Sequence, residues 1–234
     1  MTDPSAYILN VADIPALQDS MAHVAATGYT ERIICERLDL KDITDLKIRA
    51  IPIYRKEFLT ARTPLDIAIQ IFLLQGSIQA EELNRLLGKE DQDVMVRSGI
   101  LCIDGRGIAK AAVSLYPVND RRIFSDHAWP QLAFKEYPGT VPYDQVMYVG
   151  TDSRWLARAT LRRPVRAALD LCTGSGIHAL LAATHAQRAV AVDINARAAR
   201  CTIFNAQVSG INNIEVIIGD IYDPVKNEKF DLIA

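Results

Sequence analysis

Apolar residues recur at three- and four-residue spacing through the first 60 residues of the chain, which is the period of an amphipathic helix. This spacing predicts helices over 15–28, 30–38 and 43–59, and Asp42 or Thr44 is placed to cap the third of them. The front of the sequence therefore reads as helical.

The same period continues over 63–76, where Thr63 suits an N-cap, Pro64 suits the first turn and Gly76 suits a stop. A shorter amphipathic helix is predicted over 78–87. Alternation then replaces the helical period, which is typical of strands.

Strands are predicted over 99–104 and 107–118, joined by a turn at Asp104-Gly105, and a third over 121–126. Helices followed by a β-hairpin are the order of a winged-helix module.

We therefore predict a winged-helix-like unit over about 60–126, with 78–87 as its recognition helix and the hairpin as its wing. In the alternative interpretation, the same elements pack as a platform for a neighbouring domain or a partner.

The pattern of apolar residues changes twice after this unit. Residues 127–145 hold three prolines and four aromatic residues without periodicity, so we expect a linker over 127–148. From 149 to 234, apolar strands alternate with helices, and this predicts a parallel sheet with helical crossovers. The predicted domains are a helical and winged-helix-like accessory domain over 1–126 and a doubly wound α/β domain over 149–234.

Composition and charge narrow the class of protein. Half of the residues are hydrophobic and 23% are charged, as in soluble globular proteins. No apolar run approaches the roughly 18 residues of a membrane span, and the N-terminus lacks the features of a signal peptide. We expect a cytoplasmic protein without a membrane partner. Residues 1–150 hold 16 Lys and Arg against 20 Asp and Glu, which disfavours a dedicated nucleic-acid binder.

The four cysteines are scattered and form no Cys-x-x-Cys pair, which favours reduced thiols and predicts no metal site. His178 and His185 lie seven residues apart on the predicted first crossover helix and are interpreted as helix-surface residues rather than bases.

A glycine turn follows the first predicted strand of the α/β domain, in LDLCTGSGIHALLA from Leu169 to Ala182. Gly174, Gly176 and Ala179 satisfy the dinucleotide pattern G-x-G-x-x-G/A, so an NAD-linked oxidoreductase is one candidate. The match alone is weak, because such glycines only let the backbone turn sharply and approach a ligand.

Three acids at successive strand ends favour a cationic cofactor instead. Asp170 lies at the mouth of the turn, where it would repel a pyrophosphate and attract an ammonium or a sulfonium. Asp193 ends the second strand and could accept hydrogen bonds from ribose hydroxyls, while Asp220 with Ile221 could bind an adenine. Each acid also has a structural reading: Asp170 could cap the turn, Asp193 could cap the next helix, and Asp220 could simply end a strand.

The segments DLCTGSG, AVDIN, GDIYDP and FDLIA resemble the successive motifs of class I S-adenosylmethionine-dependent methyltransferases. They are most similar to the small-domain branch, which includes protein-glutamine N5, ribosomal RNA guanine-N2 and DNA adenine-N6 methyltransferases. The resemblance implies S-adenosyl-L-methionine as cofactor and a Rossmann-like fold. The expected cofactor-binding residues are Asp152, Ser153, Asp170, Cys172, Thr173, Gly174, Ser175, Gly176, Asp193, Ile194, Asp220 and Ile221.

The segment VGTDSRWLA, residues 149–157, resembles the family's stretch in which a polar turn closes over the cofactor, and Arg154 is a further candidate contact there. Cys172 stands where the family usually has glycine, and we expect the small thiol to fit.

The family has seven strands, and its substrate turn, (Asn/Asp)-Pro-Pro-(Tyr/Phe), follows the fourth. The sequence ends at FDLIA, so we expect a fragment that lacks this turn and is inactive by itself, with the remainder of the same polypeptide completing the sheet. No catalytic residue is assigned. The predicted function is methyl transfer to nitrogen of a protein, nucleic acid or small molecule. A winged-helix regulatory module fused to a cofactor-binding domain and an NAD-linked enzyme are the alternatives.

Overall fold

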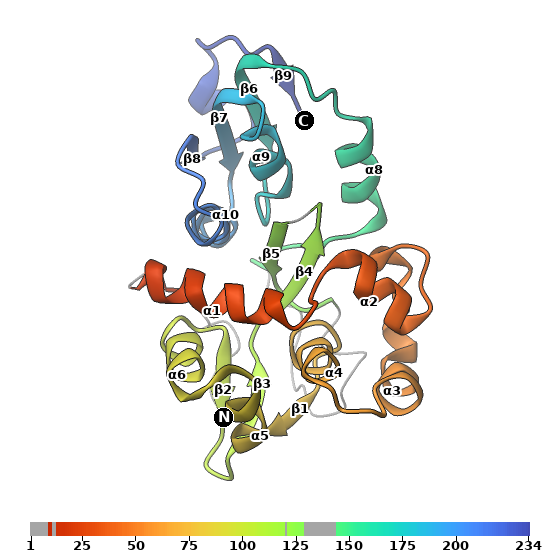
Figure 1. The fold of residues 1–234 in the computed structure, drawn as a ribbon. Coiled ribbons are helices and arrows are strands. Elements are labelled where there is room, and N and C mark those ends of the chain that lie inside the picture. Colours follow the sequence, from red (N-terminus) through yellow and green to blue (C-terminus); the bar gives the residue numbers. More distant parts are fainter. Residues whose placement is uncertain (1–8, 11–12, 120, 129–143) are drawn as a thin grey trace. The chain divides into compact units, whose positions relative to one another are not determined.

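The computed structural model describes residues 9–10, 13–119, 121–128 and 144–234. Contacts divide the chain into two units, Met1–Pro142 and Tyr143–Ala234, and each is described by itself (Figure 1). Most of the predicted linker, 127–148, lies outside the described residues. Within them, no helix has both the length and the apolar character that a membrane crossing requires.

Helices dominate the first unit, in agreement with the predicted period. The helical segments are α1 Ile14–Ala26, α2 Glu31–Leu38, η2 Ile43–Asp45, η3 Ile48–Ala50, α3 Ile51–Ile53, η4 Tyr54–Phe58, α4 Pro64–Ala68, η5 Ile69–Leu73, α5 Ala80–Leu87 and α6 Lys89–Arg97. The predicted cap at Thr63 is confirmed, because its side chain accepts a hydrogen bond from the Asp66 N–H.

The single helix predicted over 43–59 is wrong. Asp42 caps only a three-residue 3-10 turn, and the chain then passes through several short segments before a wider turn of π-type at η4. Pro52 contributes to this break, since it has no N–H to donate to the preceding turn. The helix predicted from residue 78 is also too long, because Ile78 and Gln79 belong to a strand.

Two small antiparallel sheets complete the first unit. β1 Ser77–Gln79, β2 Leu101–Ile103 and β3 Ile108–Ala111 form one sheet in the order β1-β3-β2. Its β2–β3 hairpin confirms the turn predicted at Asp104-Gly105, since Ile103 pairs with Ala109. The strand predicted over 107–118 is in fact two, and β4 Ser114–Val118 pairs separately with β5 Arg121–Ser125.

Two hydrogen-bonded contacts join distant helices of the first unit. Arg37 of α2 donates to both carboxylate oxygens of Asp66 in α4, at 2.7 and 3.0 Å. Ser20 and His23 of α1 both contact the buried carboxylate of Asp91 in α6, at 2.9 and 2.5 Å. These pairs fix helix positions that the apolar core alone would leave free to slide.

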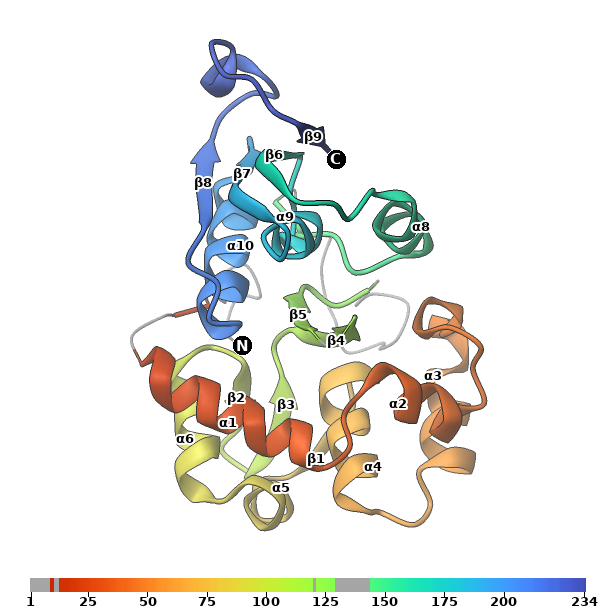
Figure 2. The same ribbon diagram turned by 45° about the horizontal axis from the view of Figure 1, so that its top comes forward.

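The second unit is an α/β layer in which all the strands are parallel (Figure 2). Its elements are α8 Thr151–Ala159, β6 Val165–Leu171, α9 Ile177–Ala182, β7 Ala186–Asp193, α10 Ala196–Val208, β8 Ile214–Ile218, η6 Asp223–Val225 and β9 Leu232–Ile233. The strand order is β8-β7-β6-β9, which confirms the predicted parallel sheet and the place of the fourth strand beside the first.

The two faces of this sheet carry side chains of different size. Leu169, Val190 and Val192 point to one face, where Val225 from the β8–β9 connection packs on them. Ala168 points to the other face and packs against Ala182 of α9. Methyl groups on this second face let the crossover helices lie close to the strands.

The pair Arg37–Asp66 yields a prediction on stability. Asp66 is only 1% exposed, and burial raises its pKa, but hydrogen bonds from Arg37 and Thr63 outweigh burial and hold the pKa below its usual value. We expect Asp66→Asn to lower the free energy of unfolding by about 1–3 kcal/mol at pH 7. Because a lowered pKa stabilises the fold fully above the ordinary value near 3.8 and less as the pH falls toward the lowered value, this gap to wild type should narrow below about pH 4.

Denaturant titrations of both proteins at pH 7 and pH 3 measure the gap. Asp93→Asn is the matched control, since Asp93 forms an exposed pair with Lys89 and should matter by less than about 1 kcal/mol. An equal gap at both pH values would contradict the role given to the Asp66 carboxylate.

Candidate functional site

A tight turn leads from β6 into α9 and has three residues in the left-handed backbone region. Cys172 and Gly174 both have φ of +57°, and Gly176 has φ of +81°. The Thr173 N–H donates to the carbonyl of Val192 at 3.1 Å, so the turn is tied to the neighbouring strand β7. The predicted glycine turn at this place is therefore present.

Gly176 has a second reason to be glycine. An added Cβ would lie 2.7 Å from Cγ2 of Thr202, whereas one at Gly174 would meet only the carbonyl oxygen of Cys172 at 3.9 Å. Close approach of α10 thus excludes a side chain at 176, while 174 faces open space.

Asp170 is buried beneath this turn. Its Oδ2 accepts a hydrogen bond from the Thr173 hydroxyl at 2.6 Å and another from the Ala179 N–H at 2.9 Å. Asp170 was considered as a cap for N–H groups of the turn, and instead it accepts from a turn hydroxyl and from an N–H of helix α9. Burial raises the pKa of Asp170 to about 7, and the charge of Asp193 adds to the rise, while the two hydrogen bonds oppose it.

Asp193 ends β7 and lies beside the turn. Its Oδ2 accepts from the Gly174 N–H and its Oδ1 from the Asn195 N–H, both at 2.9 Å. The carboxylate thus joins the glycine turn to the start of α10. Each carboxylate oxygen can accept more than one hydrogen bond, so Asp193 can also accept hydrogen bonds from the hydroxyl groups of a ligand.

Asp220 and two isoleucines extend this edge of the sheet. The Gly219 N–H donates to the carbonyl of Asp193 at 3.0 Å, which brings the end of β8 beside the end of β7. Asp220 is exposed, and Ile194 and Ile221 are 71% and 51% exposed. Large apolar side chains left in solvent beside acids are suited to cover a planar ring.

Asp152 and Ser153 lie on helix α8, before the first strand of the sheet. The polar turn expected over 149–157 is wrong from residue 151 onward, because Thr151 starts helix α8. Asp152 interacts electrostatically with His178 of α9, which partly offsets the lowering of the histidine's pKa by burial. Ser153 is half-buried, and Arg154, the further candidate, is buried.

Two residues of α10 hold the turn and were not expected from sequence. The hydroxyl of Thr202 donates to the Gly174 carbonyl at 3.1 Å, and Nδ2 of Asn205 donates to the Ser175 carbonyl at 2.8 Å. Both side chains are fully buried. The sequence feature that could have revealed them is a pair of polar residues, three apart, on an otherwise apolar face of the predicted helix.

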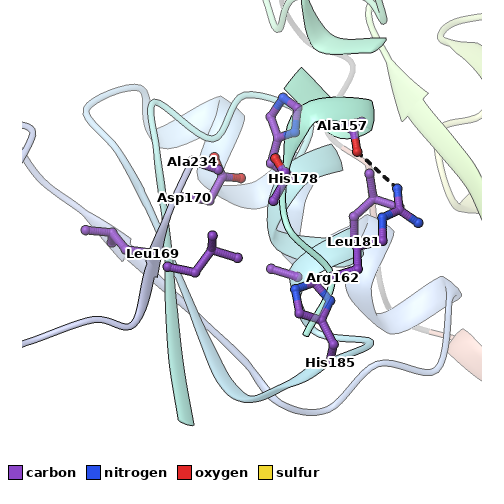
Figure 3. A pocket seen from close by; sticks show the side chains of 11 residues that line it. Ala157, Arg162, Leu169, Asp170, His178, Leu181, His185 and Ala234 are labelled. Atoms are coloured by element: carbon purple, nitrogen blue, oxygen red, sulfur yellow. Dashed lines mark hydrogen bonds between the residues drawn. The ribbon is translucent and has the colours of Figure 1, made fainter. Parts of the chain in front are cut away.

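A small cavity lies beside the paired strands β6 and β9, the two neighbours at which the strand order of the sheet reverses (Figure 3). Its enclosed space of about 10 Å³ suits a single water molecule rather than a substrate. His178 and His185, expected at the helix surface, are both half-buried and line it together with Asp170. His185 lies beyond the end of α9, and its Nε2 is buried without a hydrogen-bond partner in the described part of the chain.

None of the described residues form a group of three or more His, Cys, Asp or Glu side chains suited to hold a metal ion. The chemistry of this edge is instead that of carboxylates, backbone N–H groups and two exposed apolar side chains. Such a set favours an organic ligand with hydroxyl groups, a ring and positive charge.

Comparison with known proteins gives a match for residues 146–234 to the family described as methyltransferase small domain. A ribosomal protein L11 methylase from Lactobacillus delbrueckii subsp. bulgaricus is 30% identical, with 34% of this chain and 41% of that chain covered and a TM-score of 0.31. A SAM-dependent methyltransferase from Thiobacillus denitrificans, in complex with S-adenosyl-L-homocysteine, is 24% identical over 34% and 33% of the chains, with a TM-score of 0.30.

A precorrin 8W decarboxylase from Methanobacterium thermoautotrophicum is 23% identical, with 37% of this chain and 48% of that chain covered and a TM-score of 0.34. The chain thus spans less than half the length of each of these solved structures.

The backbone at Cys172 generates a prediction. Its φ of +57° favours glycine, since a Cβ in this region costs about 1–2 kcal/mol. We expect Cys172→Gly to raise the free energy of unfolding of the second unit by up to about 1 kcal/mol, because the added freedom of the unfolded chain offsets part of the gain.

Cys102→Gly is the matched control for this measurement. Cys102 lies in strand β2, at a position without positive φ, so the same substitution should lower stability there. Thermal unfolding of the two variants beside wild type gives the signs, and a destabilised Cys172→Gly would show that the thiol makes a contact worth more than the strain.

Proposed function

We propose that this chain binds S-adenosylmethionine and serves methyl transfer to a nitrogen atom, a proposal supported by the match of residues 146–234 to the methyltransferase small domain family. S-adenosylmethionine is the cofactor that the family indicates. The acceptor class is a protein side chain, a nucleic-acid base or a small metabolite. The observation that carries the proposal is the gathering of three carboxylates at the carboxyl ends of three adjacent parallel strands.

Asp170 is proposed to face the positive end of the cofactor. The ligand would bring an ammonium and a sulfonium to a carboxyl group that burial keeps partly protonated near neutral pH. A nearby positive charge favours the ionised carboxylate. Asp170 would therefore act as a counter-ion, while its hydrogen bonds to Thr173 and Ala179 hold it in place.

Asp193 and Asp220 are proposed to bind the nucleoside. Asp193 would accept hydrogen bonds from the ribose hydroxyls in addition to those that it accepts from the N–H groups of Gly174 and Asn195. Asp220 would accept from the adenine amino group, and Ile194 and Ile221 would cover the ring from neighbouring strand ends. Their exposure in the free protein supports this assignment.

The remaining proposed contacts come from the turn and from α8. Cys172, Thr173, Gly174, Ser175 and Gly176 form the backbone that the ligand would approach. Asp152 and Ser153 are proposed to lie near the amino-acid part of the cofactor, supported by the interaction of Asp152 with His178, which lines the same cavity as Asp170.

Methyl transfer of this kind depends mainly on positioning, since the acceptor must meet the methyl carbon in line at about 3–3.5 Å. The cofactor supplies an activated methyl group, and the residues described above bind and orient it. No residue of the chain is assigned as the base, and the inactivity of the 234-residue chain alone stays a prediction.

We also propose that about 60–126 forms a winged-helix-like unit. The succession of α4, β1, α5, α6, β2 and β3, with sheet order β1-β3-β2, supports it. Helix α6 then takes the place of the third helix, rather than 78–87 serving as the recognition helix.

Binding of S-adenosylmethionine to the full chain by calorimetry tests the site. We expect Asp220→Ala to weaken the affinity about tenfold or more without lowering the melting temperature, because Asp220 is exposed and its loss removes a hydrogen bond to a charged group. Asp193→Ala should weaken binding further and also destabilise the fold, since it releases the N–H groups of Gly174 and Asn195.

Asp223→Ala provides the control, because it removes an exposed acid three residues away on the same connection. Equal affinity in wild type and Asp220→Ala would remove Asp220 from the site. Absence of binding to wild type, with binding of NAD in its place, would overturn the proposed function.

The raised pKa of Asp170 predicts a pH dependence of binding. A cationic ligand requires the carboxylate, so the affinity for S-adenosylmethionine should rise from pH 5.5 and level off above about pH 7. Over this range the ligand's α-amino group stays charged. The loss at pH 5.5 should be about tenfold or more, within the tenfold per pH unit that one proton allows.

Asp170→Asn should bind more weakly at pH 7.5 and lose most of this dependence. Titrations at five pH values for both proteins make the comparison. A wild-type affinity that is flat over the range would separate Asp170 from the positive charge of the ligand.

A further inference from the structure

A large cavity in the first unit, remote in sequence from the methyltransferase domain, lies between α2 and the β4–β5 hairpin. Its volume is about 890 Å³, which is within the range of small-molecule sites. Tyr29 and Pro117, both buried, contribute apolar surface to it. The charged residues that line it are Glu31, Arg32, Glu36, Asp39, Lys41, Arg121 and Arg122.

Three of the cations in this cavity have no carboxylate partner within the described ranges: Lys41, Arg121 and Arg122. Several other arginines of the unit do have one. Arg32 pairs with Glu36, Arg37 with Asp66 and Arg106 with Asp104. The cavity therefore brings together three cations that lack a carboxylate partner among the described residues.

Arg121 and Arg122 are consecutive at the start of β5, and both are half-buried. Burial lowers the pKa of Arg122, and the charge of Arg121 lowers it further. Two adjacent guanidinium groups partly withdrawn from water, with no carboxylate paired to them in the part of the chain that the structure describes, oppose folding. Such an arrangement is suited to an anion, because arginine binds phosphate with several hydrogen bonds in a planar fork.

Acids on the α2 side of the cavity limit what kind of anion fits. Glu31 and Glu36 lie on α2, and Asp39 follows it with φ of +54°. These carboxylates would repel a long polyanion such as a nucleic-acid backbone. They can accept hydrogen bonds from the hydroxyl or amino groups of a compact ligand.

We propose that this cavity binds a phosphorylated small molecule, with its phosphate on Arg121 and Arg122 and its hydroxyl or amino groups toward the α2 side. Lys41 would supply further positive charge at the exposed side of the cavity. The cavity is lined by residues of the first unit, whereas the proposed cofactor site belongs to the second, so its ligand is an additional substrate or an effector. This proposal does not rest on the proposed function.

Isothermal titration of the full chain with ribose 5-phosphate tests it, with ribose as the phosphate-free probe. We expect ribose 5-phosphate to bind and ribose not to bind. Arg122→Gln should weaken binding at least about tenfold, since a charge-assisted contact is lost. Its melting temperature without ligand should equal or exceed that of wild type, because a half-buried charge that no described carboxylate neutralises has been removed.

Arg106→Gln is the matched control, since it removes the same charge from an exposed turn outside the cavity. Asp39→Asn should tighten phosphate binding about two- to threefold by removing a like charge. No binding of ribose 5-phosphate at 10 mM, or equal losses in Arg122→Gln and Arg106→Gln, would overturn the proposal. So would a lower melting temperature for Arg122→Gln, which would give Arg122 a structural role.

A single-stranded 12-mer oligonucleotide is the competitor. Failure of the 12-mer to displace ribose 5-phosphate supports a small-molecule site. Displacement that weakens steeply with salt would show a nucleic-acid surface and overturn the assignment to a small ligand.

Discussion

The turn between β6 and α9 forces the backbone into left-handed geometry three times within five residues, and the rest of the second unit is arranged around that constraint. Asp170 anchors its inner side through Thr173 and Ala179. Asp193 anchors its outer side through Gly174. The edge of the sheet that gathers the carboxylates exists because these bonds fix where β6 ends and α9 begins.

Hydrogen bonds also connect the turn with helix α10. Asp193 joins the turn to the start of α10, and Thr202 and Asn205 of α10 return hydrogen bonds to the carbonyls of the same turn. A network in which each member is bonded keeps the turn in place before any ligand arrives. The site geometry is thus a property of the folded chain and does not depend on the ligand to form it.

Local signals were enough to predict the parts of the fold that depend on neighbouring residues. The alternation of apolar strands and helices after residue 149, the Thr63 cap and the turn at Asp104-Gly105 are of this kind. Helix α6 was missed because its segment is polar, and its buried Asp91 contacts Ser20 and His23 from a helix some 70 residues away. The three-residue strand β1 depends likewise on pairing with β3.

The same distinction holds at the candidate site. The order of elements and the spacing of motifs placed Asp170 and Asp193 at the ends of neighbouring strands. The roles of Thr202 and Asn205 could not be predicted, because they depend on the rotation of α10 about its axis. The helical geometry of 151–157 was missed because the resemblance suggested a turn there, and the buried face of this helix includes the charged residue Arg154.

The alanine face of the sheet acts as a spacer of fixed thickness. Ala168, Ala189 and Ala191 are almost completely buried, and Ala168 packs directly against Ala182 of α9. Larger side chains there would lift the helix from the strands by about the width of a methyl group. The Ala179 N–H belongs to helix α9, whereas Asp170 belongs to strand β6. Their hydrogen bond of 2.9 Å therefore depends on the distance between the helix and the sheet. Larger residues on this face would therefore disturb the candidate site by changing the distance between the layers, without touching the site itself.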